Sequence, residues 1–261
     1  MKREDAQIYI IGHRPVDYGI WDNNLYTPIQ VGFNERFLNL RDNDLPDNIS
    51  EWNDIYAEQT GPYYIWKHCH PTKYKGQCQF RRRLKFSEDT DFDKLFEECD
   101  VIVGAPLIFP SSTVAVQYWT SHCKHDLDVV EDIVKNFYPD YAEDWDRWIN
   151  FGSYMFYANG FIMRSEHYDQ YAEWLFTILN LFRKHEQWYT PEQAKSVIDK
   201  QIEEGERSGV NGHEKAGGKE GNGYQYQVCG FLAERLLTLY LLHNFKFDRI
   251  KCVNYCKYEG L

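Results

Sequence analysis

The sequence predicts a single α/β domain, and three observations lead to this prediction. Short apolar, β-branched runs alternate along the chain with longer segments of helical periodicity. The chain has 261 residues, which is long enough to bury a full hydrophobic core. Its composition, 43% hydrophobic and 26% charged, is that of a globular protein rather than a disordered one.

Strands are expected where short apolar runs end in glycine or in turn residues. Residues 7–12 are the first such run, and His13 follows at its carboxyl end, where open α/β sheets bind ligands. Turn-forming residues over 16–47 predict irregular structure. Further strands are expected at 74–86, where the strand runs into a basic turn, and at 100–104, 152–163 and 245–253.

Helices are expected where apolar residues recur every three or four positions. Ser50 is the expected N-cap of the first helix, which Gly61-Pro62 breaks before a short aromatic helix over 63–68. The later helices are expected at 92–98, 113–124, 126–137, 168–182, 191–207 and 229–243. Residues 208–223 are rich in glycine and lack apolar anchors, so they are expected to form a mobile surface loop.

Charge and cysteine usage exclude several classes of protein. The net charge of −11 argues against duplex nucleic acid as a partner, because phosphate binding needs clustered cations. The polar residues 1–7 and the lack of a run near ~20 apolar residues argue against a signal peptide and a membrane helix, so we expect a cytoplasmic protein. Seven irregularly spaced cysteines indicate reduced thiols. A zinc site is disfavoured, since no C-x-x-C pair occurs among its conceivable ligands His68, Cys69, His70, Cys78, Cys252 and Cys256.

Three consecutive arginines at 81–83 are a local exception in this acidic chain. Guanidinium groups at the end of a strand can clamp a diphosphate through paired hydrogen bonds. The alternative is a solvated basic turn that pairs with Glu88, Asp89 and Asp91, and the sequence favours neither interpretation.

Two further groups of polar residues have both a functional and a structural interpretation. Asn53, Glu58 and Thr60 could bind a ribose or a base beside an aromatic wall, although helix capping is the favoured interpretation. Glu234 lies in an apolar helix, where a carboxylate is costly to bury unless it is paired or functional. It is therefore either a general base with a raised pKa or part of a structural salt bridge.

Four blocks of the sequence resemble one known family. Residues 48–68, NISEWNDIYAEQTGPYYIWKH, resemble the pattern DNIS…N…ELTGLYWIWKN, and residues 76–84, GQCQFRRRL, resemble GLCHYRRYF. Residues 159–163 and 171–179, NGFIM and YAEWLFTIL, resemble NMFIM…YCEWLFDIL, and residues 230–237, GFLAERLL, resemble GFLSERLL. These patterns belong to a bacterial family known as a domain of unknown function. Its genes occur with capsular and exopolysaccharide genes, and its members are taken to be glycosyltransferases of GT-A-like fold.

The resemblance implies a Rossmann-type mixed sheet flanked by helices, in one domain over 1–261. It implies a hexosyltransferase-type enzyme that moves a sugar from a nucleotide donor, expected to be UDP-linked, to a glycan or lipid-linked glycan. Residues 1–110 would bind the donor and residues 111–261 the acceptor, in the cytoplasm or at the inner face of the membrane. Glu234, from its place in an apolar helix, is the expected catalytic base if the enzyme inverts the anomeric configuration. The expected donor-binding residues are His13, from its place after the first strand, and, from the resemblance, Asn53, Glu58, Thr60, Trp66, Arg81, Arg82, Asn159 and Arg235.

The chain departs from the family pattern at four positions. Gln79 replaces a histidine, Phe80 and Arg83 replace tyrosines, and Gln227 stands where an arginine usually precedes the last block. The change at Gln79 matters most, because a different residue there implies a different sugar or a different mechanism if the histidine contacts the donor or a metal.

The sequence leaves alternatives open both for metal binding and for enzymatic activity. Asp126 and Asp128 form the Asp-x-Asp pattern with which metal-dependent glycosyltransferases hold Mn²⁺ or Mg²⁺, although their place at the start of a helix favours capping. A non-catalytic carbohydrate-binding or scaffold protein of a polysaccharide assembly complex is the alternative function, with aromatic residues, 17% of the chain, binding sugar. A nucleotide-processing hydrolase is a weaker option, because the sequence offers no convincing metal-binding carboxylates.

Overall fold

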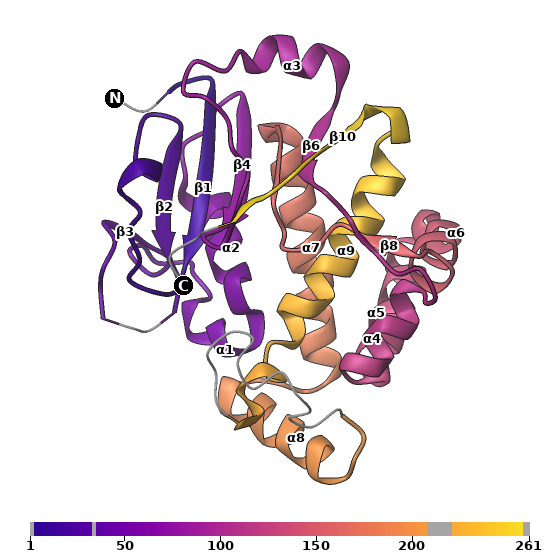
Figure 1. The fold of residues 1–261 in the computed structure, drawn as a ribbon. Coiled ribbons are helices and arrows are strands. Elements are labelled where there is room, and N and C mark those ends of the chain that lie inside the picture. The colour runs from indigo at the N-terminus through magenta and orange to yellow at the C-terminus, as the bar shows by residue number, and fades with distance from the viewer. Residues whose placement is uncertain (1–2, 33–34, 208–220, 258–261) are drawn as a thin grey trace.

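The computed structural model describes residues 3–32, 35–207 and 221–257, which form a mixed β-sheet with helices on both faces (Figure 1). The main path of the sheet has the strand order β10-β6-β9-β4-β1-β2-β3. All neighbours on this path are parallel except β9, which is antiparallel to both β4 and β6. These strands are β1 (Ala6–Gly12), β2 (Tyr26–Gln30), β3 (Leu40–Arg41), β4 (Tyr74–Gln79), β6 (Val101–Gly104), β9 (Phe161–Arg164) and β10 (Ile250–Val253).

Four short strands complete the β structure. β5 (Arg82–Arg83) pairs with β4 and with β11 (Cys256–Lys257). β7 (Leu107–Ile108) and β8 (Tyr154–Met155) form a separate two-stranded sheet. The described helices are α1 (Asn53–Tyr56), α2 (Thr60–His68), α3 (Phe92–Glu98), α4 (Val114–Ser121), α5 (Lys124–Phe137), α6 (Ala142–Trp145), α7 (Ser165–His185), α8 (Pro191–Glu203) and α9 (Val228–Asn244).

Alternation along β1 assigns its side chains to two cores. Tyr9 and Ile11 belong to the larger core, which also contains apolar residues of α4, α5, α7 and α9, whereas Ile8 and Ile10 belong to the smaller core on the other face. The smaller core includes Phe92 and Phe96 of α3. The expected Rossmann-type mixed sheet flanked by helices is therefore confirmed.

α9 is the most completely buried helix of the larger core and supports the cleft described below. Its apolar residues surround it on all sides, as expected for a helix enclosed by protein rather than one lying on a surface. It lies between α7 and the α4–α5 pair in Figure 1. No described helix is both long and apolar enough to span a lipid bilayer.

The structure corrects the expected irregular segment over 16–47, because it contains β2 and β3. Pro28 in the middle of β2 disguises the strand, since proline cannot donate to a β-ladder. Strand β3 pairs with β2 only at Ile29 and Gln30, so β3 does not require a hydrogen bond from Pro28.

The first helix also differs from the expectation. Ser50 is not an N-cap; it begins a 3₁₀ turn, η2 (Ser50–Trp52), and its hydroxyl donates to Asp42 at 2.9 Å. The interruption falls at Ala57, whose φ is +51°, and not at Gly61-Pro62, which lie in the first turn of α2. Proline is tolerated there because N–H groups of a first helical turn have no partner within the helix.

The expected strand or hairpin at 152–163 is instead two strands in different sheets. β8 pairs with β7, while β9 inserts between β4 and β6 in the main sheet. The expected strand at 245–253 begins only at Ile250, after the 3₁₀ turn η7 (Phe247–Arg249). Most of the expected loop at 208–223 lies outside the described residues, and its end belongs to the 3₁₀ turn η6 (Gly221–Tyr224).

Candidate active site

A cleft of about 620 Å³ opens at the carboxyl ends of three parallel strands. Its lining includes His13 after β1, Gly32 after β2 and Gln79 at the end of β4. These strands are adjacent, so their ends meet at one edge of the sheet, which is where open α/β sheets bind ligands. The opposite wall comes from α9 and α4, so residues far apart in sequence form one site.

The three arginines divide between two faces. Arg81 and Arg82 line the cleft. Arg83 is buried, donates from Nε to the Phe80 carbonyl at 2.7 Å, and lies over the ring of Trp21. Neighbouring residues of a strand point to opposite faces, which accounts for the separation of Arg82 from Arg83 in β5.

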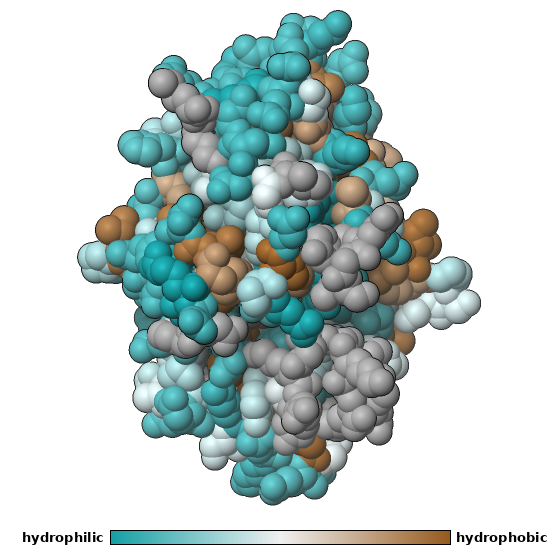
Figure 2. Space-filling view, turned by 60° about the vertical axis from the view of Figure 1, so that its left-hand side comes forward, coloured by the Kyte–Doolittle hydropathy of each residue, from teal (hydrophilic) through white to brown (hydrophobic). Residues whose placement is uncertain are grey.

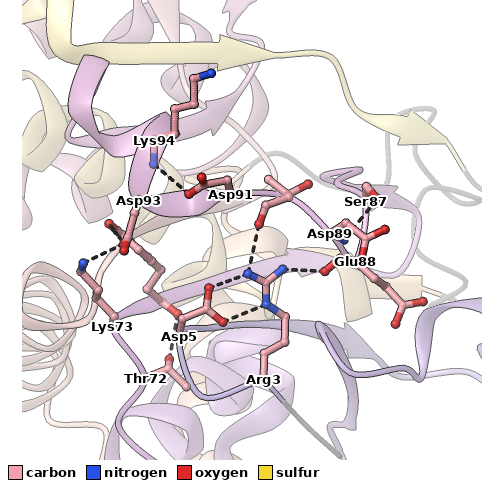
Figure 3. Close-up of polar contacts among 12 residues, drawn as sticks. Arg3, Asp5, Thr72, Lys73, Ser87, Glu88, Asp89, Asp91, Asp93 and Lys94 are labelled. Carbon is pink, nitrogen blue, oxygen red and sulfur yellow. Dashed lines mark hydrogen bonds and ion pairs between the residues drawn. The ribbon is translucent and has the colours of Figure 1, made fainter.

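The acidic residues that could neutralise the basic turn lie elsewhere. Figure 3 shows Arg3 at the centre of this acidic group, with hydrogen bonds to the Asp5 carboxylate and the Glu88 carbonyl. Asp91 caps α3 by accepting from the Lys94 N–H at 3.0 Å. The alternative of a surface turn paired with these acids is therefore wrong.

The cleft arginines form an unbalanced cationic cluster. Burial lowers the pKa of Arg81, and the nearby charges of Arg82 and Arg14 lower it further, whereas Glu58 opposes them. Arg81 and Arg82 thus place two guanidinium groups near the Glu58 carboxylate in a partly desolvated part of the cleft. Such a place favours a ligand that carries two or more negative charges.

Glu58 lies at the junction between the arginines and the helices. Its Oε1 accepts from the Gln79 amide at 2.9 Å and from the Asn159 amide at 3.0 Å. The other end of the Gln79 side chain accepts from Arg82 at 3.4 Å. Gln79, the main departure from the family pattern, thus joins the carboxylate to the arginine cluster.

A strained turn lies between Glu58 and Glu234. Ala158 and Asn159 have φ values of +62° and +47°, a conformation that costs free energy for residues other than glycine and is eased for asparagine. The Ala158 N–H donates to Glu234 Oε1 at 2.7 Å, while Asn159 donates to Glu58. The two carboxylates therefore hold one turn from opposite sides.

Glu234 is paired and yet partly accessible. Its Oε2 lies 3.3 Å from Arg235, and its side chain keeps 21% of its exposure at the cleft. Burial raises the pKa of Glu234, and the Glu58 charge adds to this, whereas Arg235, the Ala158 N–H and Arg82 oppose it. Both interpretations of Glu234 are thus present, a salt bridge and a carboxylate with a raised pKa.

Three expected donor-binding residues instead support the site from within. Arg235 is buried, and its guanidinium donates to the Phe231 carbonyl and to Gln117 as well as to Glu234. Asn159 is 1% exposed. Thr60 is equally buried and accepts from Asn53 at 3.1 Å.

Asn53 reaches the cleft but uses its amide internally. It donates to the Ala57 carbonyl at 2.7 Å, next to Glu58, and thereby holds the strained Ala57 backbone. Behind it the buried Asp42 accepts from the Ser50 hydroxyl at 2.9 Å, and burial raises the pKa of Asp42. No local pattern singles out Asp42, because it lies in a run of residues typical of turns.

Other predicted residues lie outside the cleft. Trp66 stacks on Phe176 of α7 at an angle of 8°. Asp126 is fully buried and takes two hydrogen bonds of 2.7 Å from Arg207, and Asp128 pairs on the surface with Lys124. Neither aspartate caps α5 through its side chain.

A metal site is not formed by the described residues. The Asp-x-Asp pair is split between a buried ion pair and a surface one, so it does not fit Mn²⁺ or Mg²⁺. Nor do any three histidine, cysteine or acidic side chains in the described ranges come together as ligands. All seven cysteines are free.

Gly230 sets the distance between α9 and the strained backbone. A Cβ at this position would lie 2.9 Å from the Cβ of Ala57. Alanine in a helix is favoured over glycine by about 1 kcal/mol, but overpacking costs about 1–3 kcal/mol. The net expectation is that Gly230→Ala lowers the free energy of unfolding in urea denaturation by up to about 2 kcal/mol.

Ala57→Gly provides the matched control, because it removes the opposing methyl group and suits the positive φ at this position. The double variant should recover the stability lost in Gly230→Ala. If the two changes are simply additive, the contact does not set this distance.

Comparisons with known proteins agree with this architecture. Residues 7–198 match the family model described as a domain of unknown function, DUF4422. The solved apo structure of WbbM, a bifunctional glycosyltransferase, is similar to 96% of this chain with a TM-score of 0.70 and 23% identity. This chain spans 44% of the WbbM chain, so the likeness concerns the fold of one part of that protein.

A second solved structure is more distant. The mannosyltransferase Ktr4p from S. cerevisiae aligns over 99% of this chain and 71% of its own, with a TM-score of 0.39 and 11% identity, which is too low to support an inference. No curated protein matches the sequence. The family model covers well over half of the chain, and the fold is the GT-A-like fold of a solved glycosyltransferase. The protein therefore belongs to the DUF4422 family.

Proposed function

We propose that this protein is a glycosyltransferase that moves a hexosyl group from a nucleotide sugar, UDP-linked, to a glycan or lipid-linked glycan in polysaccharide synthesis. The observation that carries the proposal is the pair of partly buried arginines, Arg81 and Arg82, that lines the cleft at the carboxyl edge of the sheet. A sugar diphosphate supplies the negative charge that this cluster lacks. The fold shared with WbbM supports the same class of activity.

The nucleotide would lie over the ends of β1 and β2, between His13 and Gly32. Gly32, whose φ is +84°, follows a parallel strand, where such sheets bind ligands, and Asn53 lies so close that its Oδ1 would be 2.9 Å from a Cβ at this position. The diphosphate would then reach the arginines, which stabilise it as it leaves. In this proposal residues 1–110 bind the donor and part of 111–261 binds the acceptor.

Glu234 would act as the general base. The acceptor hydroxyl oxygen forms a bond to the anomeric carbon of the donor sugar, the bond from that carbon to the diphosphate breaks, and the diphosphate takes the electron pair. The hydroxyl proton passes to Glu234, whose raised pKa suits this role. Arg235 and the Ala158 N–H hold the carboxylate in place.

The setting of this reaction is part of the proposal. Free thiols at all seven cysteines suit the reducing cytoplasm, where we place the enzyme, including at the inner face of the membrane. Hydrophilic residues cover most of the face in Figure 2, and its hydrophobic residues form small separate groups. Contact with a membrane would therefore be peripheral.

Replacing Arg81 or Arg82 by glutamine is expected to weaken binding of UDP by about 10- to 100-fold, because each loses charge-assisted hydrogen bonds worth about 1.5–3 kcal/mol. Isothermal titration calorimetry with UDP measures this loss. Arg147→Gln, which removes an exposed arginine from the surface ion pairs with Glu143 and Asp144, is the matched control and should bind UDP like the unaltered protein.

The same protein tests the whole proposal. Release of UDP from a UDP-sugar, in the presence of a glycan acceptor, is expected. Tight UDP binding without turnover of any UDP-sugar would support a non-catalytic sugar-binding protein instead. Equal UDP affinity in both arginine variants would contradict the assignment of the cluster.

A further inference from the structure

We infer that the end of the cleft between α4 and α9 is the acceptor subsite, and that it is built for an uncharged sugar. This inference rests on the proposed function and names the class of acceptor. The strand ends and the arginines occupy one end of the cleft, and Glu234 lies beyond them on α9. The acceptor must meet the base from the remaining side, where Gln117, Gln227, Tyr224 and Phe231 line the wall.

Aromatic rings form one wall of this subsite. His122 stacks on Phe231 with ring centroids 3.9 Å apart, and Tyr224 lies 4.9 Å from the same Phe231 ring. Gln225 donates to the Ser121 carbonyl at 3.1 Å and so fastens the segment that carries Tyr224 to the end of α4. Fixed aromatic rings offer an apolar face to the C–H groups of a pyranose ring.

Apart from Arg235 and the His122 ring, the described polar side chains that line the subsite are uncharged or acidic. Gln227 is half-exposed, and its side-chain amide makes no hydrogen bond to the described residues, so it can bind sugar hydroxyls. Arg235 is the only arginine or lysine among the described residues lining this end, and Glu234, Gln117 and the Phe231 carbonyl already occupy it.

A negatively charged acceptor would therefore be rejected. A carboxylate or phosphate group here would lie near Glu234 and Glu58. Among the described residues of the lining, Arg235 is already hydrogen-bonded, and Arg81 and Arg82 would hold the donor diphosphate in the proposed reaction. Repulsion by like charges in a partly desolvated cleft discriminates strongly against such a group.

The test compares two sets of probes that differ by one charge. Binding of p-nitrophenyl glycosides of neutral hexoses and of the corresponding hexuronides is measured by saturation-transfer NMR with UDP present, after UDP binding has been verified. We expect neutral glycosides to bind and hexuronides not to. Tyr224→Ala should weaken neutral binding by about tenfold, as the loss of one aromatic contact implies.

Gln227→Arg should admit hexuronides, whereas Gln170→Arg, which adds the same charge at an exposed position of α7, should leave the preference unchanged. Three results would each overturn the inference. Hexuronides could bind as well as neutral glycosides, Gln227→Arg could leave the preference unchanged, or a protein that binds UDP could bind neither class of glycoside. Failure of UDP itself to bind would instead refute the proposed function.

Discussion

Replacing Glu234 by glutamine is expected to lower the turnover of sugar transfer by about 10²- to 10⁴-fold, which is the usual contribution of a general base. Glutamine is nearly the same size, and its carbonyl oxygen can still accept the Ala158 N–H that Glu234 accepts at 2.7 Å. The fold and the affinity for UDP should therefore be retained while turnover is lost. Steady-state release of UDP, with calorimetry of UDP binding, separates the two effects.

The pH dependence of the unaltered enzyme provides a second test of Glu234 as the general base. Burial raises the pKa of Glu234, so the acidic limb of the pH–rate profile should lie above the range of an ordinary glutamate. Below that pKa the carboxyl group is protonated and cannot accept the hydroxyl proton, so the rate falls as the pH is lowered. Glu173→Gln, which changes an exposed glutamate of α7, should leave both rate and profile unaltered. Turnover in Glu234→Gln within roughly tenfold of the unaltered rate would exclude Glu234 as the base.

Replacing Asp126 by alanine is expected to lower the free energy of unfolding by about 3–5 kcal/mol, because it leaves the charge of Arg207 buried without a partner. Both side chains are almost completely buried, and Arg207 donates to both carboxylate oxygens at 2.7 Å. Tyr118 adds a third hydrogen bond at 3.2 Å. Chemical denaturation followed by circular dichroism measures the loss.

Asp128 is the matched control for Asp126, being two residues away in the same pattern. It is exposed and pairs with Lys124 one helical turn earlier, so Asp128→Ala should change the stability by no more than about 0.5 kcal/mol. Replacing both Asp126 and Arg207 by apolar residues should cost less than Asp126→Ala alone, since no unpaired charge remains. Strong stabilisation of the unaltered protein by Mn²⁺, lost equally in both aspartate variants, would contradict the ion-pair interpretation.

Predictions from the sequence are most reliable where a local pattern of apolar residues is compatible with one kind of secondary structure. The apolar run at residues 7–12 could only be a buried strand in an α/β chain, and it is β1. The spacing of apolar residues predicts that α5 and α7 bury one face and that α9 is buried all round, and all three pack in the larger core. Pro28 obscures the pattern of strand β2 in the sequence, and only the folded sheet shows that β3 pairs beyond it, at Ile29 and Gln30.

The site residues could be found from the sequence more readily than their roles. The sequence alone singles out Arg81, Arg82, Glu58 and Glu234, and all four line one cleft. Their spacing in the chain did not show that Arg83 turns away from the cleft, since that follows from strand alternation in β5.

By itself the sequence determined the class of the fold, its main elements and the concentration of positive charge in an acidic chain, because these depend on composition and local periodicity. The tertiary structure alone decided which polar residues face a ligand and which hold one another. Asp126 met Arg207 from 81 positions away, and Asn159 met Glu58 from 101 positions away. Such pairings depend on where the chain returns after long excursions, and no local pattern of residues specifies that.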